Sequence, residues 1–168
     1  FLRQCRHVLI PIWAFSIGLG VEELGLIQSI SAALDMTLFY PVGLIMDKFG
    51  RKWTSVPSII LLSSGFIFMT YVDTFTGLMI VGLLLGFANG LGSGAMLTLG
   101  SDLSPKKQPG SFLGIWRLFG WSGNSAGGPI SGAVAQTLGN TASALSVSTI
   151  GVIGVIIFSF FLQETLKE

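Results

Sequence analysis

Two oppositely charged residues stand inside long apolar stretches of this chain, where few other side chains can do chemistry. Arg6 lies in the first stretch and Asp35 in the second, within SAALDMTLFYP. A charge at the centre of a bilayer costs about 3 kcal/mol on insertion scales, so such residues are functional candidates. Counted from the connection between the two stretches, at about 1.5 Å per helical residue, their depths differ by only about 6 Å. We therefore predict that Arg6, or Arg3 one turn away, pairs with Asp35.

Such a pair has two interpretations that the sequence leaves open. In the first, the pair is functional and binds an anionic substrate or carries a coupled proton. In the second, it is a fixed ion pair that holds two helices together and has no role in transport. Two amides stand near the middles of later apolar stretches, where they hydrogen-bond either a substrate or a neighbouring helix. The predicted substrate or coupling residues are Arg3, Arg6, Asp35, Asn89 and Asn124.

The composition decides the environment of these residues. The 168-residue chain is 51% hydrophobic and 10% charged, whereas a soluble domain carries about 25% charged residues. This composition predicts a polytopic membrane protein, and the absence of the alternating pattern of a membrane barrel makes the class all-α. A net charge of +1 gives no reason to expect a nucleic-acid partner. One cysteine and one histidine leave almost no ligands for a metal site, so we expect neither metal nor cofactor.

Polar and charged breaks divide the chain into six apolar spans, each near the ~20 residues that a transmembrane helix needs. These spans form a single transmembrane domain, residues 1–168, that we expect to be a fragment of a larger protein. The expected spans cover residues of about 1–20, 25–46, 54–72, 76–99, 111–137 and 142–162.

Lysine and arginine are distributed unevenly over the connections between these spans. Six of them follow the second and fourth spans or lie in the tail, and none follows the first, third or fifth span. Connections rich in these residues stay on the cytoplasmic side. We therefore expect an integral protein of the plasma (inner) membrane, with the charged loops and the C-terminus in the cytoplasm.

The densest charge lies in GLIMDKFGRKWTSVP, residues 43–57. This segment resembles the signature loop of the major facilitator superfamily of secondary transporters, Gly-x-x-x-Asp-Arg/Lys-x-Gly-Arg-Lys/Arg, which joins the second and third helices of a six-helix half. Residues 101–118 and GGPISG at 127–132 resemble two further elements of that family. The positions that match the signature are Gly43, Asp47, Lys48, Gly50, Arg51 and Lys52.

The resemblance implies a transmembrane helical bundle that is one six-helix half of a twelve-helix transporter, with its site near the midplane between halves. We favour the C-terminal half, helices seven to twelve, because the fourth span has no arginine and the chain stops shortly after the sixth. The implied function is secondary active transport of a small organic molecule by alternating access, coupled to H+. The GGPISG element is associated with antiporters, so efflux of drug-like or metabolite substrates is slightly favoured.

The expected partners are a small-molecule substrate, H+, the lipid bilayer and the other six-helix half. The alternative function is a non-transporting membrane receptor or scaffold that keeps the fold. A common cleft for the polar residues of four spans would favour transport. Enzyme activity is not expected, because no paired catalytic carboxylates or serine–histidine arrangement can be placed together.

The charged loop acts in the family as a latch that favours one conformational state. We extend this gating set to Asp102 and Arg117. Asp47 is expected to face the positive end of a neighbouring helix, or to pair with Arg51 or Arg117. Asp47→Asn should then alter transport rate more than substrate affinity.

Glycines recur at intervals of four in the fourth span and again in the fifth. Small residues on one helix face let another helix approach closely. In the charged loop, Gly43 is likewise expected to allow close approach, and Gly50 a tight turn. The positions expected in helix packing or a kink are Gly82, Gly86, Gly90, Gly94, Gly128, Pro129 and Gly132.

Overall fold

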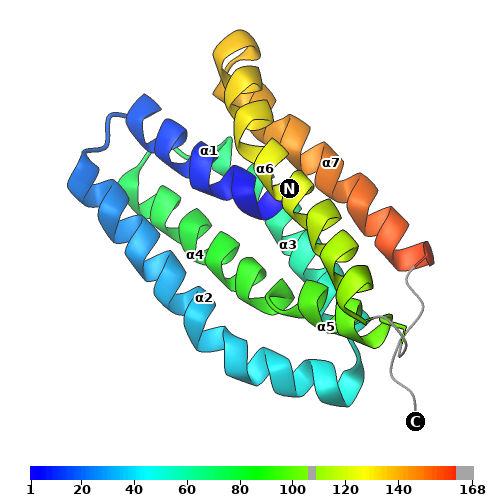
Figure 1. Cartoon of the computed structure of the whole chain (residues 1–168). Coiled ribbons are helices and arrows are strands. Elements are labelled where there is room, and N and C mark those ends of the chain that lie inside the picture. The colour runs from blue at the N-terminus through cyan, green and yellow to red at the C-terminus, as the bar shows by residue number, and fades with distance from the viewer. Residues whose placement is uncertain (106–108, 162–168) are drawn as a thin grey trace.

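The computed structural model is a bundle of helices and describes residues 1–105 and 109–161, apart from the side chains of residues 96, 97 and 161 (Figure 1). The described residues contain no strand, which confirms the all-α class. The seven helices are α1 (Leu2–Ser16), α2 (Val21–Phe49), α3 (Lys52–Met69), α4 (Phe75–Gly92), α5 (Ala95–Asp102), α6 (Pro109–Leu138) and α7 (Asn140–Phe161).

Four of the described helices, α2, α3, α4 and α7, are long and apolar enough to cross a membrane. The other two expected spans correspond to α1, which has 15 residues, and α6, which has 30 residues and is rich in glycine and serine. A full span needs ~20 mainly apolar residues. The count of six spans therefore stays a prediction.

Helix α2 is longer at both ends than its expected span. The chain turns before Val21, so Glu22 and Glu23 lie in the first turn of α2 rather than between helices. Glu23 Oε2 accepts a hydrogen bond from the Gly20 amide at 2.9 Å, and acidic groups favour this positive end of a helix. At the other end α2 continues to Phe49. Asp47, Lys48 and Phe49, which were expected in the loop, are therefore helical.

The fourth expected span is broken into α4 and α5. Gly94 has φ +82°, a left-handed conformation that glycine adopts without steric cost. It is the N-cap of α5, and among the described side chains a Cβ placed on it would meet only Met46 Cε, at 3.5 Å. Gly94 therefore redirects the chain, and the expectation that it continues the packing face is wrong.

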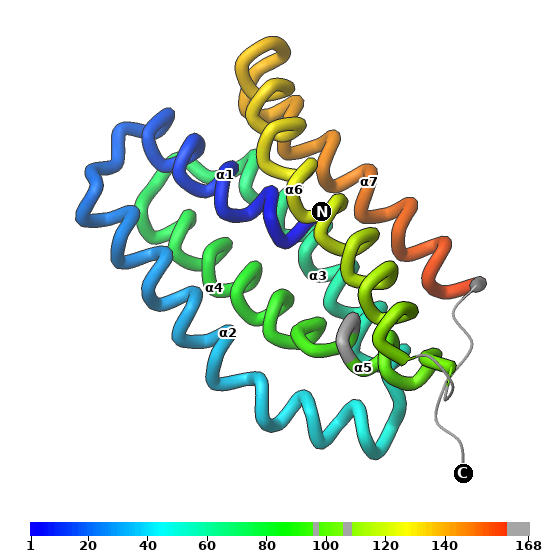
Figure 2. The backbone as a smooth tube through the Cα atoms, viewed as in Figure 1, coloured from blue at the N-terminus to red at the C-terminus, as the bar shows by residue number. Residues whose placement is uncertain are grey.

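The helices pack in a consistent order, with α4 between α2 and α3, α7 against α3, and α1 against α6 (Figures 1 and 2). The main core joins apolar side chains of α1, α2, α3, α4 and α7. The glycines of α4 face α2, as their spacing predicts. A Cβ on Gly82 would lie 2.8 Å from Ile27 Cγ2, and a Cβ on Gly90 would lie 2.8 Å from Leu38 Cβ.

The close contact of α6 with α1 falls at Gly127, one of the glycines that recur at intervals of four in the expected fifth span. A Cβ on Gly127 would lie 2.8 Å from the Phe1 carbonyl oxygen. At Gly128 and Gly132 the corresponding distances to Val8 are 3.5 and 3.9 Å, which are ordinary contacts. Pro129 lies inside α6 on an exposed face. Gly127 is thus the position where α1 and α6 approach most tightly.

Candidate functional site

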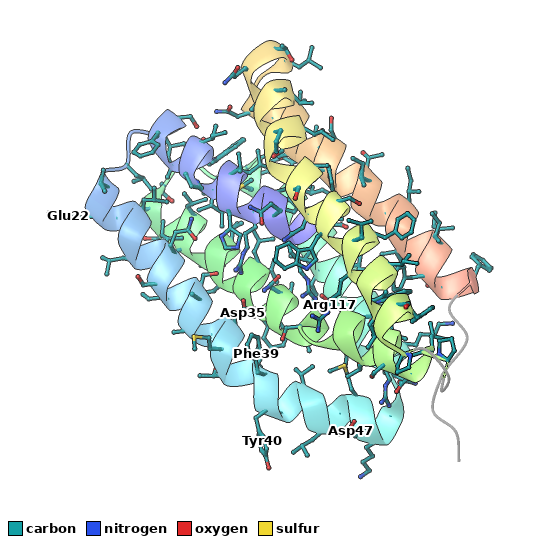
Figure 3. All side chains as sticks on the ribbon, in the orientation of Figure 1. Glu22, Asp35, Phe39, Tyr40, Asp47 and Arg117 are labelled. Carbon is teal, nitrogen blue, oxygen red and sulfur yellow. The ribbon has the colours of Figure 1, made fainter. Side chains whose placement is uncertain are left out.

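An ion pair joins α1 to α2 inside the bundle. Arg6 Nη2 lies 3.6 Å from Asp35 Oδ2, and the two side chains are 5% and 12% exposed. The pair predicted from the sequence is therefore present. Figure 3 shows Asp35 midway along α2, between Glu22 near one end and Asp47 near the other. A pair this deeply buried is favourable only when hydrogen bonds satisfy the remaining donors and acceptors.

Helix α4 and a second residue of α2 supply some of these hydrogen bonds. Asn89 Nδ2 donates to Asp35 Oδ2 at 2.6 Å. Arg6 Nη1 donates to Ser31 Oγ at 3.4 Å and to the Leu85 carbonyl oxygen at 3.3 Å. Ser31, Asp35, Arg6 and Asn89 are called the polar cluster below. Ser31 lies four residues before Asp35 and so on the same face of α2, which is the signal that the sequence analysis missed.

Three buried atoms of the polar cluster have no hydrogen-bond partner among the described residues: Arg6 Nε, Asp35 Oδ1 and Asn89 Oδ1. A buried polar atom without a partner costs about 1–3 kcal/mol. Both Arg6 and Asn89 contact the Oδ2 atom of Asp35. The other carboxylate oxygen is thus left as an acceptor, and the polar cluster retains capacity to bind a proton or a polar ligand.

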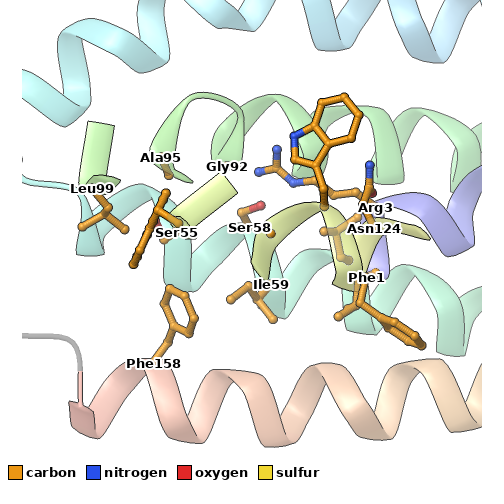
Figure 4. Close-up of a pocket in the computed structure, with 15 residues that line it drawn as sticks. Phe1, Arg3, Ser55, Ser58, Ile59, Gly92, Ala95, Leu99, Asn124 and Phe158 are labelled. Carbon is orange, nitrogen blue, oxygen red and sulfur yellow. The ribbon is translucent and has the colours of Figure 1, made fainter. Parts of the chain in front are cut away.

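Arg3 and Asn124 lie apart from the polar cluster, on the wall of a cavity of about 510 Å³ (Figure 4). This cavity is partly open and is lined by residues of α1, α3, α4, α5, α6 and α7. The common cleft expected for four polar residues is therefore divided. Arg6, Asp35 and Asn89 converge at the polar cluster, while Asn124 faces the cavity.

Arg51 and Lys52 of the charged loop contact residues near the ends of α2, α5 and α7. Arg51 Nε lies 2.9 Å from Asp102 Oδ2, at the end of α5, and Arg51 Nη1 donates to the Met46 carbonyl oxygen at 3.3 Å. Lys52 Nζ donates to the Ser159 carbonyl oxygen near the end of α7 at 2.7 Å. These contacts fasten the start of α3 to α5 and α7, and we call them the loop contacts.

The match to known proteins covers nearly the whole chain. Residues 7–168 match the Major Facilitator Superfamily. The chain belongs to this superfamily. It is also similar to the hexuronate transporter of Bacillus subtilis (strain 168), with 25% identity over 173 residues that cover 99% of this chain and 40% of that protein. The chain thus spans less than half the length of this relative.

Membership of the superfamily and the apolar helices make the chain part of an integral membrane protein. The predicted resemblance is confirmed. Among the described residues, no group of three or more potential ligands is placed to hold a metal ion.

Asp47, the acidic residue of the superfamily signature, was expected to face the positive end of a helix or to pair with Arg51 or Arg117. Asp47 and Lys48 are exposed in the last turn of α2, whereas Arg51 faces Asp102. Of the three alternatives for Asp47, an ion pair with Arg51 is not present among the described residues. Arg117 is exposed on α6, and Figure 3 shows it well separated from Asp47. Neither of the two ion pairs in the described part of the chain includes Arg117.

The two glycines of the signature also differ from each other. Gly50 ends α2 with φ +100°, so it makes the tight turn that was expected. A Cβ on Gly43 would meet nothing within 4 Å among the described residues. The close helix approach expected at Gly43 is therefore absent from this structure.

Proposed function

We propose that the chain is one half of a secondary active transporter that carries a small organic anion by alternating access, coupled to H+. The observation that supports this proposal is the polar cluster, a buried ion pair shared by α1, α2 and α4 whose three buried atoms lack partners. A buried ion pair that only holds helices together is most stable when all its polar atoms are hydrogen-bonded. An incompletely satisfied pair is suited to exchanging partners.

Protonation of Asp35 would remove the counter-ion of Arg6. The guanidinium would then be an uncompensated cation in a low-dielectric site, which favours uptake of an anion. Proton binding and anion binding thus favour one another at the polar cluster. This linkage supports co-transport of H+ and substrate, whereas the efflux suggested by GGPISG requires the two to compete. The relative's hexuronate, a carboxylated sugar, belongs to the same class of organic anion.

The test of this function is uptake by the full-length protein in proteoliposomes. With radiolabelled glucuronate and naphthoate as probes, an acidic outer solution should drive accumulation, and a protonophore should abolish it. Uptake that follows the substrate gradient but ignores the proton gradient would contradict coupling. A correctly folded protein that moves no organic anion under either gradient would favour the receptor or scaffold alternative.

The proposal includes a second six-helix half, with this chain as helices seven to twelve. The chain covers 40% of the relative. The rest of the relative is therefore long enough to contain a second half of at least equal length. We further propose the plasma (inner) membrane, with the loop contacts on the cytoplasmic side, on the basis of lysine and arginine distribution. Six further spans and a second copy of the signature elsewhere in the full-length protein would support this architecture.

We propose that the loop contacts are the latch, with Asp102 in the role first expected for Asp47. Asp102→Asn should lower the maximal transport rate about fivefold, because a partly exposed ion pair contributes about 1 kcal/mol. The KM for substrate should change less than about twofold, since Asp102 lines neither the polar cluster nor the cavity. Initial uptake rates over a range of substrate concentrations measure both quantities.

The matched control is Asp73→Asn, which removes an exposed carboxylate from the turn before α4 and should leave both quantities unchanged. Asp47→Asn should have a smaller effect on rate than Asp102→Asn. A loss of affinity at normal rate in Asp102→Asn would be evidence against a latch.

A further inference from the structure

The cavity beside Arg3 has the size of a small-molecule site, since such sites occupy about 300–1,000 Å³ and this one has about 510 Å³. It lies near the end of the bundle that carries the loop contacts, because Ser55, Leu99 and Phe158 line it and are close in sequence to those contacts. Most of its remaining wall is apolar or aromatic. The aromatic side chains that line it are Phe1, Trp116, Trp121 and Phe158.

Arg3 brings a positive charge to this apolar wall (Figure 4). Its Nη2 atom lies against Gly92 and Ser58, as a Cβ on Gly92 would contact both side chains. Within the described ranges, the two ion pairs involve other arginines, and Arg3 forms no direct salt bridge, although Asp35 interacts with it electrostatically at longer range. A cation removed from water without a counter-ion is costly. The ligand that best compensates Arg3 is an anion, and a carboxylate matches the planar guanidinium with two parallel hydrogen bonds.

The hydroxyl groups of the cavity are already used by the protein. Ser58 Oγ donates to the Ala88 carbonyl oxygen at 2.6 Å, and Ser55 Oγ donates to the Arg51 carbonyl oxygen at 2.8 Å. The other side chains of the lining that carry donors are Arg3, Asn124 and the indoles of Trp116 and Trp121. Each indole has a single N–H. Because each buried hydroxyl without a partner costs about 1–3 kcal/mol, this cavity is poorly suited to a sugar acid with several hydroxyls.

Within the aromatic wall, Trp116 is held in position by its neighbours. The ring of Trp116 stacks on Phe112, with centroids 6.1 Å apart and planes inclined by 18°. A Cβ on Gly100 would lie 2.6 Å from Trp116 Cδ1, so α5 also packs directly against this indole. A wall fixed in this way loses little side-chain entropy when a ring packs on it, and contacts between aromatic rings contribute about 0.5–1.5 kcal/mol beyond area burial.

We infer that the cavity binds a small aromatic carboxylate, with its carboxylate on Arg3 and its ring against Trp116 and Trp121. This inference rests on the transport function proposed above and narrows its substrate from organic anions to aromatic monoanions. It also separates this chain from its relative, whose name specifies hexuronate. The carboxylate of this substrate is thus bound by Arg3 in the cavity rather than by Arg6, and protonation of Asp35, which interacts electrostatically with both arginines, remains the coupling step.

The test is calorimetric titration of the purified full-length protein with four probes. 1-Naphthoate should bind, and 1-naphthalenemethanol, which has the same ring without the charge, should bind at least tenfold more weakly. Glucuronate, which has the carboxylate with several hydroxyls, should bind at least tenfold more weakly as well. Laurate tests for a carboxylate of lipid origin and should not displace naphthoate.

Three variants locate the site. Arg3→Gln should weaken naphthoate about 10- to 100-fold, as expected for a charged hydrogen bond, and leave naphthalenemethanol unchanged. Trp121→Leu should weaken both probes, while Trp53→Leu, whose indole is equally exposed at 71% but lies outside the cavity, should weaken neither. Arg117→Gln is the matched charge control and should bind naphthoate normally. If Arg3→Gln does not fold, Arg3→Lys keeps the charge without the planar fork and should show a loss of at least fivefold.

The outcomes distinguish this inference from the proposed function. Proton-driven uptake of glucuronate without binding of naphthoate would overturn the aromatic ligand and leave the transport function in place. Binding of naphthoate that depends on Arg3, in a protein that transports nothing, would support the ligand class and refute transport. Displacement of naphthoate by laurate, or unchanged binding in both Arg3 variants, would overturn the inference.

Discussion

Asp35→Asn is expected to abolish proton-driven accumulation of substrate by the full-length protein, with at least a tenfold fall in initial uptake at acidic outer pH. The asparagine keeps the shape of Asp35 and an oxygen that accepts from Asn89, but it cannot bind and release a proton. The counter-ion of Arg6 would also be absent at every pH. Uptake should therefore become independent of the proton gradient, and any residual transport should only follow the substrate gradient.

The measurement is uptake in proteoliposomes at several outer pH values, with and without a protonophore. Asp73→Asn is the control, because it removes a carboxylate that is exposed in the turn before α4. Asp35→Glu keeps a titratable group and should retain part of the pH dependence. Unchanged transport with unchanged pH dependence in Asp35→Asn would remove Asp35 from the mechanism.

The stability of this variant needs a separate check, because removal of one partner leaves the other as an uncompensated buried charge at a cost of about 3–5 kcal/mol. Arg6 retains its hydrogen bonds to Ser31 and the Leu85 carbonyl oxygen, which moderates this cost. Size-exclusion chromatography would show whether the variant is folded. The double variant Arg6→Gln with Asp35→Asn leaves no unpaired charge and should be folded but uncoupled.

The Arg6–Asp35 pair was predictable because charges are rare inside the apolar stretches. Two opposite charges at similar depth in consecutive helices have few other partners, and the rise of an α-helix is enough to compare their depths. The hydrogen bond from Asn89 to Asp35 was not predictable in the same way. It depends on how α4 is rotated against α2, and the glycines that set this rotation specify a face without specifying a partner for each residue.

The loop contacts show that residues close in sequence need not pair in the structure. Asp47 precedes Arg51 by four residues, yet Gly50 turns the chain between them, and Arg51 reaches an acid about fifty residues away in α5. The break at Gly94 places Asp102 there. A single left-handed glycine in a stripe of helical glycines has no distinct sequence signal, so neither the break nor the pairing could be foreseen. The cavity likewise depends on six helices at once.

Gly86→Ala is expected to disturb both the fold and the polar cluster. A Cβ at this position would lie 2.5 Å from the Ser31 carbonyl oxygen and 2.7 Å from Ser31 Oγ. Because the nearer atom belongs to the backbone, α2 and α4 must move apart, which typically costs about 1–3 kcal/mol. The same movement lengthens the 2.6 Å hydrogen bond between Asn89 and Asp35. Thermal unfolding in detergent should show a lower midpoint, and proton-driven uptake should fall several-fold.

The control for this change is Gly25→Ala, on the exposed face of α2, where a Cβ would meet nothing within 4 Å in the described part of the chain. Alanine is the better helix former by about 1 kcal/mol, so this variant should be neutral or slightly more stable. Gly86→Ala gains the same helix propensity. A lower unfolding midpoint in Gly86→Ala therefore reports the steric conflict with Ser31. If both variants raise the midpoint equally, the α2–α4 contact is not as close as the structure shows. Lower uptake at an unchanged midpoint would instead place the effect of Gly86 in the polar cluster alone.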